Sequence, residues 1–179
     1  MANIGIVDDK SAEMDEVLNM LTRRNLLYRI VSAPDPKLDL TVQLGSKDFP
    51  RESAIDPSDF AARVRAKLGD DKRLVRLYGT STVIAHLTGD GKQAQLYLLS
   101  YTRSGERGQG GGRGQQTGGG AGGQPIRVRV LGHYRPVKFA GYGVAEAAKL
   151  TDVENPGGTT EFTVPLFSTL GIIDLEATK

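Results

Sequence analysis

The chain has 179 residues, of which 39% are hydrophobic and 25% are charged, a composition typical of a folded globular protein. The net charge of +2 is too small to indicate a nucleic acid partner, and the absence of cysteine excludes disulfides and thiolate chemistry. No apolar run approaches the ~18 residues that a membrane-spanning helix needs. The acidic N-terminal residues do not resemble an export signal. We therefore expect a soluble chain whose compartment is unknown, and an extracytoplasmic location stays open for a longer parent protein.

The first 72 residues have the pattern of an α/β segment. Residues 4–7 form a short apolar run that predicts a buried strand, with Asp8 and Asp9 at its carboxyl end. Ser11 is a suitable N-cap for the helix that follows, and Asn25 suits a left-handed cap at its end. Residues 26–31 predict a second strand, so this β-α-β unit should have parallel strands.

The rest of this segment is too short to complete an α/β domain. Residues 38–44 predict a third strand, residues 47–55 a loop, and Asp56-Pro57 the start of a second helix that ends at Gly69. So small an open sheet would have one uncovered face. We therefore expect the remainder of a longer polypeptide, or another subunit, to pack on the 1–72 segment.

From residue 73 the hydrophobic period becomes two, which is typical of half-buried strands. Strands are predicted at 74–78, 80–87, 94–101, 126–131, 137–140, 160–166 and 171–175. The turn Gly89-Asp90-Gly91-Lys92 joins two of them in a hairpin, and residues 132–136 and 155–158 are predicted loops. The predicted fold class is α+β, with a truncated open α/β segment at 1–72 and an antiparallel β-sandwich at 73–179.

Residues 104–124 are a glycine-rich tract with 11 glycines in 21 positions. Such a tract cannot bury apolar surface, so it predicts a flexible loop. Its ends, near Tyr101 and Ile126, should still be neighbours across a hairpin, because closing a long loop costs little. The two Arg-Gly units in the tract lack interleaved aromatic residues, so a tolerated insertion is favoured over an RNA-binding segment.

The sequence contains no recognisable catalytic or metal-binding constellation. His86 and His133 have no partners at metal-ligand spacing, and no serine lies in a Gly-x-Ser-x-Gly motif. A strand that ends in paired acidic residues also begins receiver domains, but the third strand here lacks the aspartate that such domains need. Asp8 and Asp9 are therefore expected to be solvated loop residues. We predict no catalytic residue, no metal and no cofactor.

Tyrosine is the residue type that most favours a ligand site. Four tyrosines, Tyr97, Tyr101, Tyr134 and Tyr142, would form a platform for stacking sugars if they shared one face of the sandwich. With Arg135 as a polar contact, the candidate ligand-binding residues are Tyr97, Tyr134, Arg135 and Tyr142.

Several segments follow the order of a known type of bacterial protein. They are the helix after DPSDF (56–60), the strand KRLVRLYG (72–79), the hairpin LTGDG (87–91), and the strands LLSY (98–101) and IRVRVLG (126–132). In this order the chain resembles the C-terminal part of proteins that carry a beta-galactosidase trimerisation-like domain followed by a β-sandwich. That domain is related in fold to class I glutamine amidotransferases and is thought to have lost its catalytic triad and to serve in assembly. The resemblance implies a non-catalytic role, and it implies a short turn where this chain has its glycine-rich insertion.

Three functions follow from these observations. The leading hypothesis is a non-catalytic assembly or accessory module of a larger, carbohydrate-active bacterial protein. The first alternative is a carbohydrate-binding β-sandwich with tyrosine and arginine contacts. The second is a fragment of a glycoside hydrolase whose active site lies in a missing N-terminal region and is completed by Asp8 or Asp9.

Overall fold

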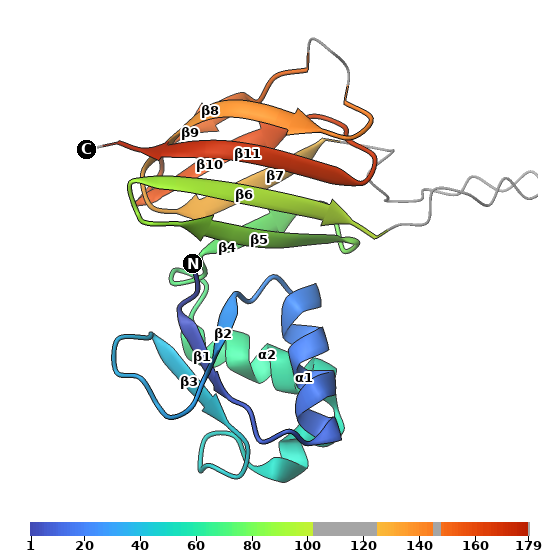
Figure 1. The fold of residues 1–179 in the computed structure, drawn as a ribbon, viewed down its shortest axis with the longest axis vertical. Helices are drawn as coiled ribbons and strands as arrows, with labels where there is room; N and C mark the ends of the chain where they lie inside the picture. The colour runs from blue at the N-terminus through green and yellow to red at the C-terminus, as the bar shows by residue number, and fades with distance from the viewer. Residues whose placement is uncertain (102–124, 145–147, 179) are drawn as a thin grey trace, which may run out of the picture.

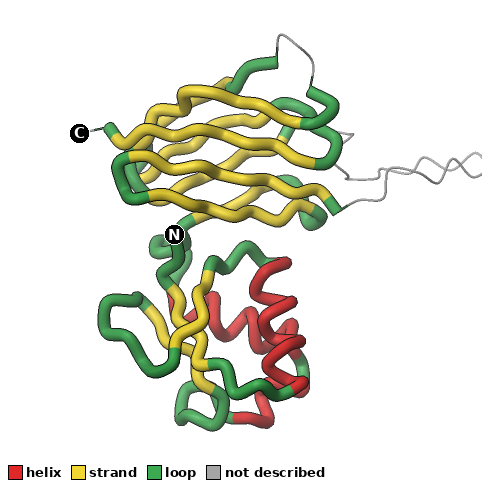
Figure 2. The backbone as a smooth tube through the Cα atoms, viewed as in Figure 1, coloured by secondary structure: helices red, strands yellow, loops and turns green. Residues whose placement is uncertain are grey.

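The computed structural model describes residues 1–101, 125–144 and 148–178. These residues form two lobes, a smaller N-terminal lobe that contains the helices and a larger lobe of packed strands (Figure 1). The distribution of helix and strand between the lobes is clear in Figure 2, where all helical segments lie in the smaller lobe. None of the helices in these ranges is long and apolar enough to cross a membrane.

The N-terminal lobe is a three-stranded parallel sheet in the order β2-β1-β3 with helices beside it. Its elements are β1 (Ile4–Val7), α1 (Ala12–Arg23), β2 (Tyr28–Val31), β3 (Leu40–Gln43), the 3-10 helix η1 (Arg51–Ile55) and α2 (Pro57–Leu68). The loop predicted at 47–55 therefore contains a 3-10 turn. The strands are short, at four residues each, so most of the stability of this lobe must come from the helices packed on the sheet.

The helix boundaries follow the local chemistry of the sequence. The Ser11 hydroxyl accepts a hydrogen bond from the Met14 N–H (3.3 Å), and the Asp56 carboxylate accepts from the Ser58 and Asp59 N–H groups (2.9 and 3.0 Å). Both expected N-caps are thus present, and they satisfy amides that have no partner inside a helix. Asn25 has φ +55°, which is the left-handed conformation predicted for it after α1.

Both helices pack against one face of the parallel sheet. Ile4 and Ile6 of β1 are fully buried in one cluster with residues of α1 and α2, including Met14 and Phe60. The opposite face of β1 carries Gly5, beside which the side chain of Leu38 lies. In Figure 1 the two helices lie on the same side of this sheet.

The larger lobe is an antiparallel β-sandwich, as predicted. Its strands are β4 (Val75–Tyr78), β5 (Val83–Gly89), β6 (Gln93–Ser100), β7 (Ile126–Leu131), β8 (Tyr134–Gly141), β9 (Thr151–Glu154), β10 (Thr159–Val164) and β11 (Leu170–Ala177). They form two four-stranded sheets, β4-β7-β10-β9 and β5-β6-β11-β8. The core between them is built from alternate residues of each strand, including the fully buried Leu96, Val128, Phe162 and Ile173.

Two strand predictions in this lobe need correction. β8 begins at Tyr134, so the second half of the loop predicted at 132–136 is strand. Pro136 is tolerated there because β8 is an edge strand with an irregular register against β11. β9 was not predicted at all, because its four residues are all exposed and show no alternation of apolar and polar side chains.

The predicted hairpin across the glycine-rich tract is wrong. β6, which precedes the tract, pairs with β5 and β11, whereas β7, which follows it, pairs with β4 and β10 in the other sheet. The connection therefore crosses from one sheet to the other, as is common in sandwiches. The tract itself, residues 104–124, lies outside the described residues.

Asn25 joins the two lobes. Its side-chain nitrogen donates to the Val83 carbonyl (3.1 Å), and its side-chain oxygen accepts from the Ala85 N–H (2.6 Å). Val83 and Ala85 belong to β5, the edge strand of its sheet. The Asn25 amide thus takes the place of a neighbouring strand and satisfies backbone groups that an edge leaves unpaired.

Candidate functional site

The outward side chains of the β5-β6-β11-β8 sheet form an open surface of the sandwich lobe. Strand register arranges them in four rows across the sheet, which together we call the outer face. From one end to the other the rows are Ile84, Leu99 and Leu170; His86, Tyr97, Ile172 and Ala140; Thr88, Gln95, Asp174 and Lys138; and Gln93, Glu176 and Arg135. The outer face therefore changes from apolar to charged along the strand direction.

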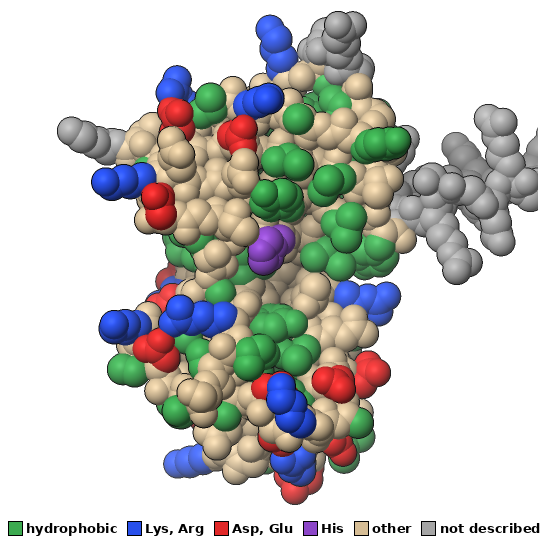
Figure 3. Space-filling model, viewed as in Figure 1, with side chains coloured by type: hydrophobic (Ala, Val, Ile, Leu, Met, Phe, Trp, Pro, Cys, Tyr) green, Lys and Arg blue, Asp and Glu red, His purple; other side chains and the backbone are tan. Residues whose placement is uncertain are grey.

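The first two rows make up the apolar half of the outer face. Leu99 is 44% exposed, and Ile84, Tyr97 and Ile172 are partly exposed beside it. Figure 3 shows hydrophobic side chains gathered on this side of the sandwich, while charged side chains lie toward its other end. Contiguous exposed apolar side chains of this kind typically mark a contact surface.

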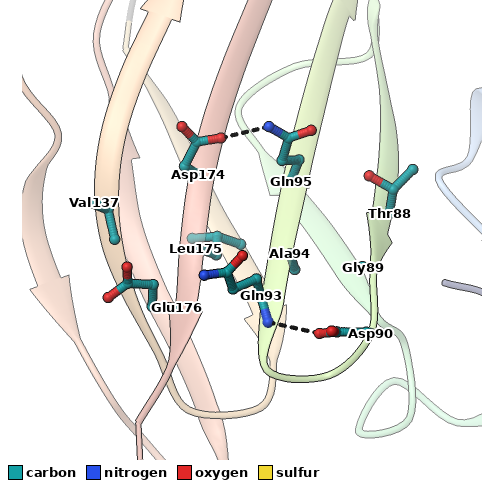
Figure 4. Close-up of a pocket in the computed structure, with 10 residues that line it drawn as sticks. All are labelled: Thr88, Gly89, Asp90, Gln93, Ala94, Gln95, Val137, Asp174, Leu175 and Glu176. Atoms are coloured by element: carbon teal, nitrogen blue, oxygen red, sulfur yellow. Dashed lines mark hydrogen bonds between the residues drawn. The ribbon is translucent and has the colours of Figure 1, made fainter.

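The third and fourth rows border a shallow cavity of about 570 Å³ (Figure 4). The Tyr97 hydroxyl donates to the Gln95 side-chain oxygen (2.7 Å), and the Gln95 amide nitrogen donates to Asp174 (2.8 Å). Glu176, two residues along β11, forms an ion pair with Arg135. The cavity thus presents an ordered set of hydrogen-bonding groups, one of which, Gln95, is held by the Tyr97 hydroxyl.

This arrangement offers contacts for a polar ligand. Hydroxyl, amide and carboxylate groups beside an aromatic ring are the contacts that a sugar needs. Each carboxylate already has one donor, since Asp174 accepts from Gln95 and Glu176 accepts from Arg135.

The structure separates the residues that the sequence proposed for a ligand site. Tyr97 and Arg135 both lie on the outer face. Tyr134 is only 6% exposed, its ring belongs to the sandwich core, and burial raises the pKa of its phenol. Tyr142 is 76% exposed just beyond β8, where its N–H donates to the Leu170 carbonyl (2.8 Å). Tyr101 lies at the junction of the lobes, under the guanidinium group of Arg23. The four tyrosines do not form one platform.

Gln95, Asp174 and Glu176 were not recognised from the sequence. Gln95 and Asp174 are 79 positions apart, so no local spacing could bring them together. The available signal was the alternation of β6, which places Gln93, Gln95 and Tyr97 on one face of the strand.

The acidic pair after β1 is held by local contacts. Asp8 accepts from the Lys10 ammonium group (2.5 Å), and Asp9 accepts from the Ser11 hydroxyl (2.6 Å) and forms an ion pair with Arg51. The Ser11 hydroxyl and the Arg51 guanidinium lower the pKa of Asp9 to about 2. Within the described ranges no group of histidine, aspartate and glutamate side chains is arranged to hold a metal ion.

The two histidines are far apart in the fold. His86 lies on the outer face, with its ring centre 6.4 Å from that of Tyr97. His133 is exposed between β7 and β8. Their positions agree with the expectation of strand-surface and loop residues.

Comparison with known proteins finds similarity to solved structures but no match in sequence. No protein-family model matches the sequence, and no curated protein matches it. The solved structure of alpha-L-fucosidase isoenzyme 2 from Paenibacillus thiaminolyticus is similar over 100% of this chain, with a TM-score of 0.67 and 9% sequence identity. The chain spans about half, 49%, of the length of that fucosidase chain. At this identity the similarity establishes the shared fold.

Proposed function

We propose that this chain is a non-catalytic assembly module of a larger, carbohydrate-active protein, and that two copies pair through the apolar half of the outer face. The observation that carries the proposal is the group of apolar side chains on an open sheet around the exposed Leu99 and the partly exposed Ile172. The carbohydrate context is supported by the fold shared with half of a fucosidase chain. The resemblance of the 1–72 segment to a trimerisation-like domain supports the assembly role.

The order of the rows makes the outer face self-complementary. A two-fold axis parallel to the strands, midway between β6 and β11, would place each row of one copy against the same row of the other. Ile172 would then face Tyr97, and Leu170 would face Leu99, because these residues are opposite each other across β6 and β11. In the polar rows Asp174 would face Gln95, so the pairing brings no like charges together there.

A second contact surface is proposed on the 1–72 segment. The face of the parallel sheet opposite α1 and α2 carries the partly exposed Val7 and Val31 beside polar side chains, namely Arg29, Thr41 and Gln43. Such a sheet is usually covered on both faces. We assign this face to the remainder of the longer polypeptide, which leaves the outer face of the sandwich for the second copy.

Self-association is tested by sedimentation velocity over a series of protein concentrations. Leu99→Asp places a charge in the apolar half and should weaken the dimer at least about tenfold, since an unpaired charge in an apolar contact is costly. Val153→Asp on β9 is the matched control, because Val153 is 47% exposed against 44% for Leu99 but belongs to the other sheet. A chain that stays monomeric at all concentrations, or equal dissociation by both variants, would refute this function.

Carbohydrate binding at the polar half is the second candidate, favoured by the cavity lined by Gln95 and Asp174 and by the chain of hydrogen bonds from Tyr97 through Gln95 to Asp174. Titration with L-fucose and D-galactose, followed by amide NMR shifts, tests it. Gln95→Ala should abolish saturable shifts, and Tyr142→Ala, which changes an exposed tyrosine outside the cavity lining, should leave them unchanged. Tyr134 is unsuitable for this test because its substitution would disturb the core.

A further inference from the structure

A second cavity lies between the two lobes, away from the outer face. Its volume is about 530 Å³, within the range of ligand-binding cavities. The lining comes from both helices, from Arg73, and from the strands and loop around residues 77–81 and 101. Four of its lining residues are arginines, Arg23, Arg24, Arg65 and Arg73, and none of the lining residues is acidic. We call this cavity the arginine cleft.

Positive charge in the arginine cleft exceeds the negative charge beside it. Asp70 accepts two hydrogen bonds from Arg65 (2.8 and 2.7 Å) and lies 3.6 Å from Arg73 and 3.7 Å from Arg76. One carboxylate therefore faces three guanidinium groups. The Arg65 hydrogen bonds, together with the charges of the three arginines, lower the pKa of Asp70 to about 2. Arg23 forms no ion pair within the described ranges; its guanidinium lies over the ring of Tyr101.

Arg73 is the most unusual member of the cleft. It is only 8% exposed, and its Nε has no hydrogen-bond partner among the described residues. A terminal nitrogen donates to the Arg24 carbonyl (3.0 Å), while burial and the neighbouring charge of Arg65 lower its pKa. A buried guanidinium is costly unless negative charge and hydrogen-bond acceptors surround it. The cleft supplies too little negative charge and too few hydrogen-bond acceptors to surround the Arg73 guanidinium.

Helix capping explains only part of this cluster. Arg23 lies in the last turn of α1, Arg24 is its C-cap, and Arg65 lies in the last turn of α2, where basic side chains interact favourably with the helix dipole. However, both helix ends open into the same cavity, and Arg73 belongs to neither helix. A dipole effect does not require a buried arginine between the lobes.

We propose that the arginine cleft binds an oxyanion, a carboxylate, sulfate or phosphate group carried by a small molecule. Guanidinium groups recognise such anions through paired N–H donors. The hydroxyl-bearing residues Thr80 and Ser81 and the ring of Tyr101 line the same cavity. They provide contacts for an uncharged part of the ligand, such as a sugar ring.

The test is titration of the full chain with D-galacturonate, D-galactose, sodium sulfate and sodium phosphate at constant ionic strength, followed by amide NMR shifts. The expected result is saturable shifts of cleft residues with an oxyanion and none with D-galactose. Tighter binding of D-galacturonate than of inorganic anions would identify an acidic sugar as the source, and the reverse order a free anion. Both orders support an oxyanion site.

Two charge-matched double variants test whether the arginines of the cleft are responsible for anion binding. Arg23→Gln/Arg24→Gln should weaken binding about tenfold or more, since hydrogen bonds to charged groups are lost. Lys37→Gln/Arg63→Gln removes the same charge from exposed residues outside the cleft lining and should change the affinity less than about twofold. Arg23→Gln alone is a milder variant that removes no hydrogen bond seen among the described residues. Absence of saturable binding by every anion, or equal losses in both double variants, would overturn the proposal.

Discussion

Replacing Asn25 tests how the two lobes are held together. Asn25→Gly removes the side-chain amide that satisfies the Val83 carbonyl and the Ala85 N–H of β5. Glycine also accepts the φ of +55° at this position without strain, so the backbone effect of the substitution is small. The measured change then reports mainly the two lost hydrogen bonds.

The size of the effect follows from the burial of the groups left behind. Both hydrogen bonds are buried, and each buried group without a partner costs about 1–3 kcal/mol. Together this gives about 2–6 kcal/mol. Water can approach an edge strand once the side chain is gone, so we expect the lower end, about 2–3 kcal/mol of unfolding free energy.

Two measurements check this prediction. Urea unfolding followed by circular dichroism should show a lower midpoint for Asn25→Gly, and hydrogen exchange should show loss of protection at the Ala85 amide. Lys10→Gly is the control, since Lys10 also has positive φ (+61°) but is exposed; its stability should change by less than about 1 kcal/mol. An unchanged midpoint together with a protected Ala85 amide would show that Asn25 does not hold the lobes together.

Three further substitutions test the fold. Asp9→Asn should flatten the dependence of unfolding free energy on pH measured between pH 6 and pH 2. The Ser11 hydroxyl and Arg51 lower the pKa of Asp9 to about 2 in the folded chain, so these contacts of the carboxylate stabilise the fold above about pH 4 and are lost as the pH falls toward 2. Gly89→Ala should lower the melting temperature more than Gly79→Ala, because both have positive φ but a Cβ at Gly89 would lie 2.3 Å from a backbone oxygen, whereas Gly79 has open space. Phe162→Ala should cost about 3–5 kcal/mol in urea unfolding, since its fully buried ring fills the sandwich core; a loss below about 1 kcal/mol would contradict that role.

Local chemistry was predictable from the sequence, whereas long-range pairing was not. The N-caps Ser11 and Asp56 were predicted correctly because a cap depends only on residues within one helical turn. The hairpin at Gly89 was predictable for the same reason. The neighbours of β6 and β7 were not, because the choice of sheet depends on packing across the whole sandwich.

The candidate site residues show the same difference between local features, which were predictable, and long-range contacts, which were not. Tyr134 looked like a surface aromatic, but β8 begins at Tyr134 itself and turns its ring into the core. Asn25 was predicted as a left-handed cap, and this local property is correct. Its bonds to a strand about 60 positions further along the chain carry no sequence signal, because any polar side chain at a helix end looks alike before the lobes are assembled.

The Asn25 contact and the arginine cleft depend on each other physically. Asn25 lines the cleft and follows Arg23 and Arg24 directly, so its bonds to β5 fix where these guanidinium groups lie relative to Thr80 and Ser81. The hydrogen bond from Arg73 to the Arg24 carbonyl is a further contact at the same junction, in addition to the two hydrogen bonds of Asn25. Repulsion between the arginine side chains opposes the docking of the two lobes, and an anion bound between the arginines would reduce this repulsion. An oxyanion ligand would therefore stabilise the docked arrangement of the lobes as well as occupy the cleft.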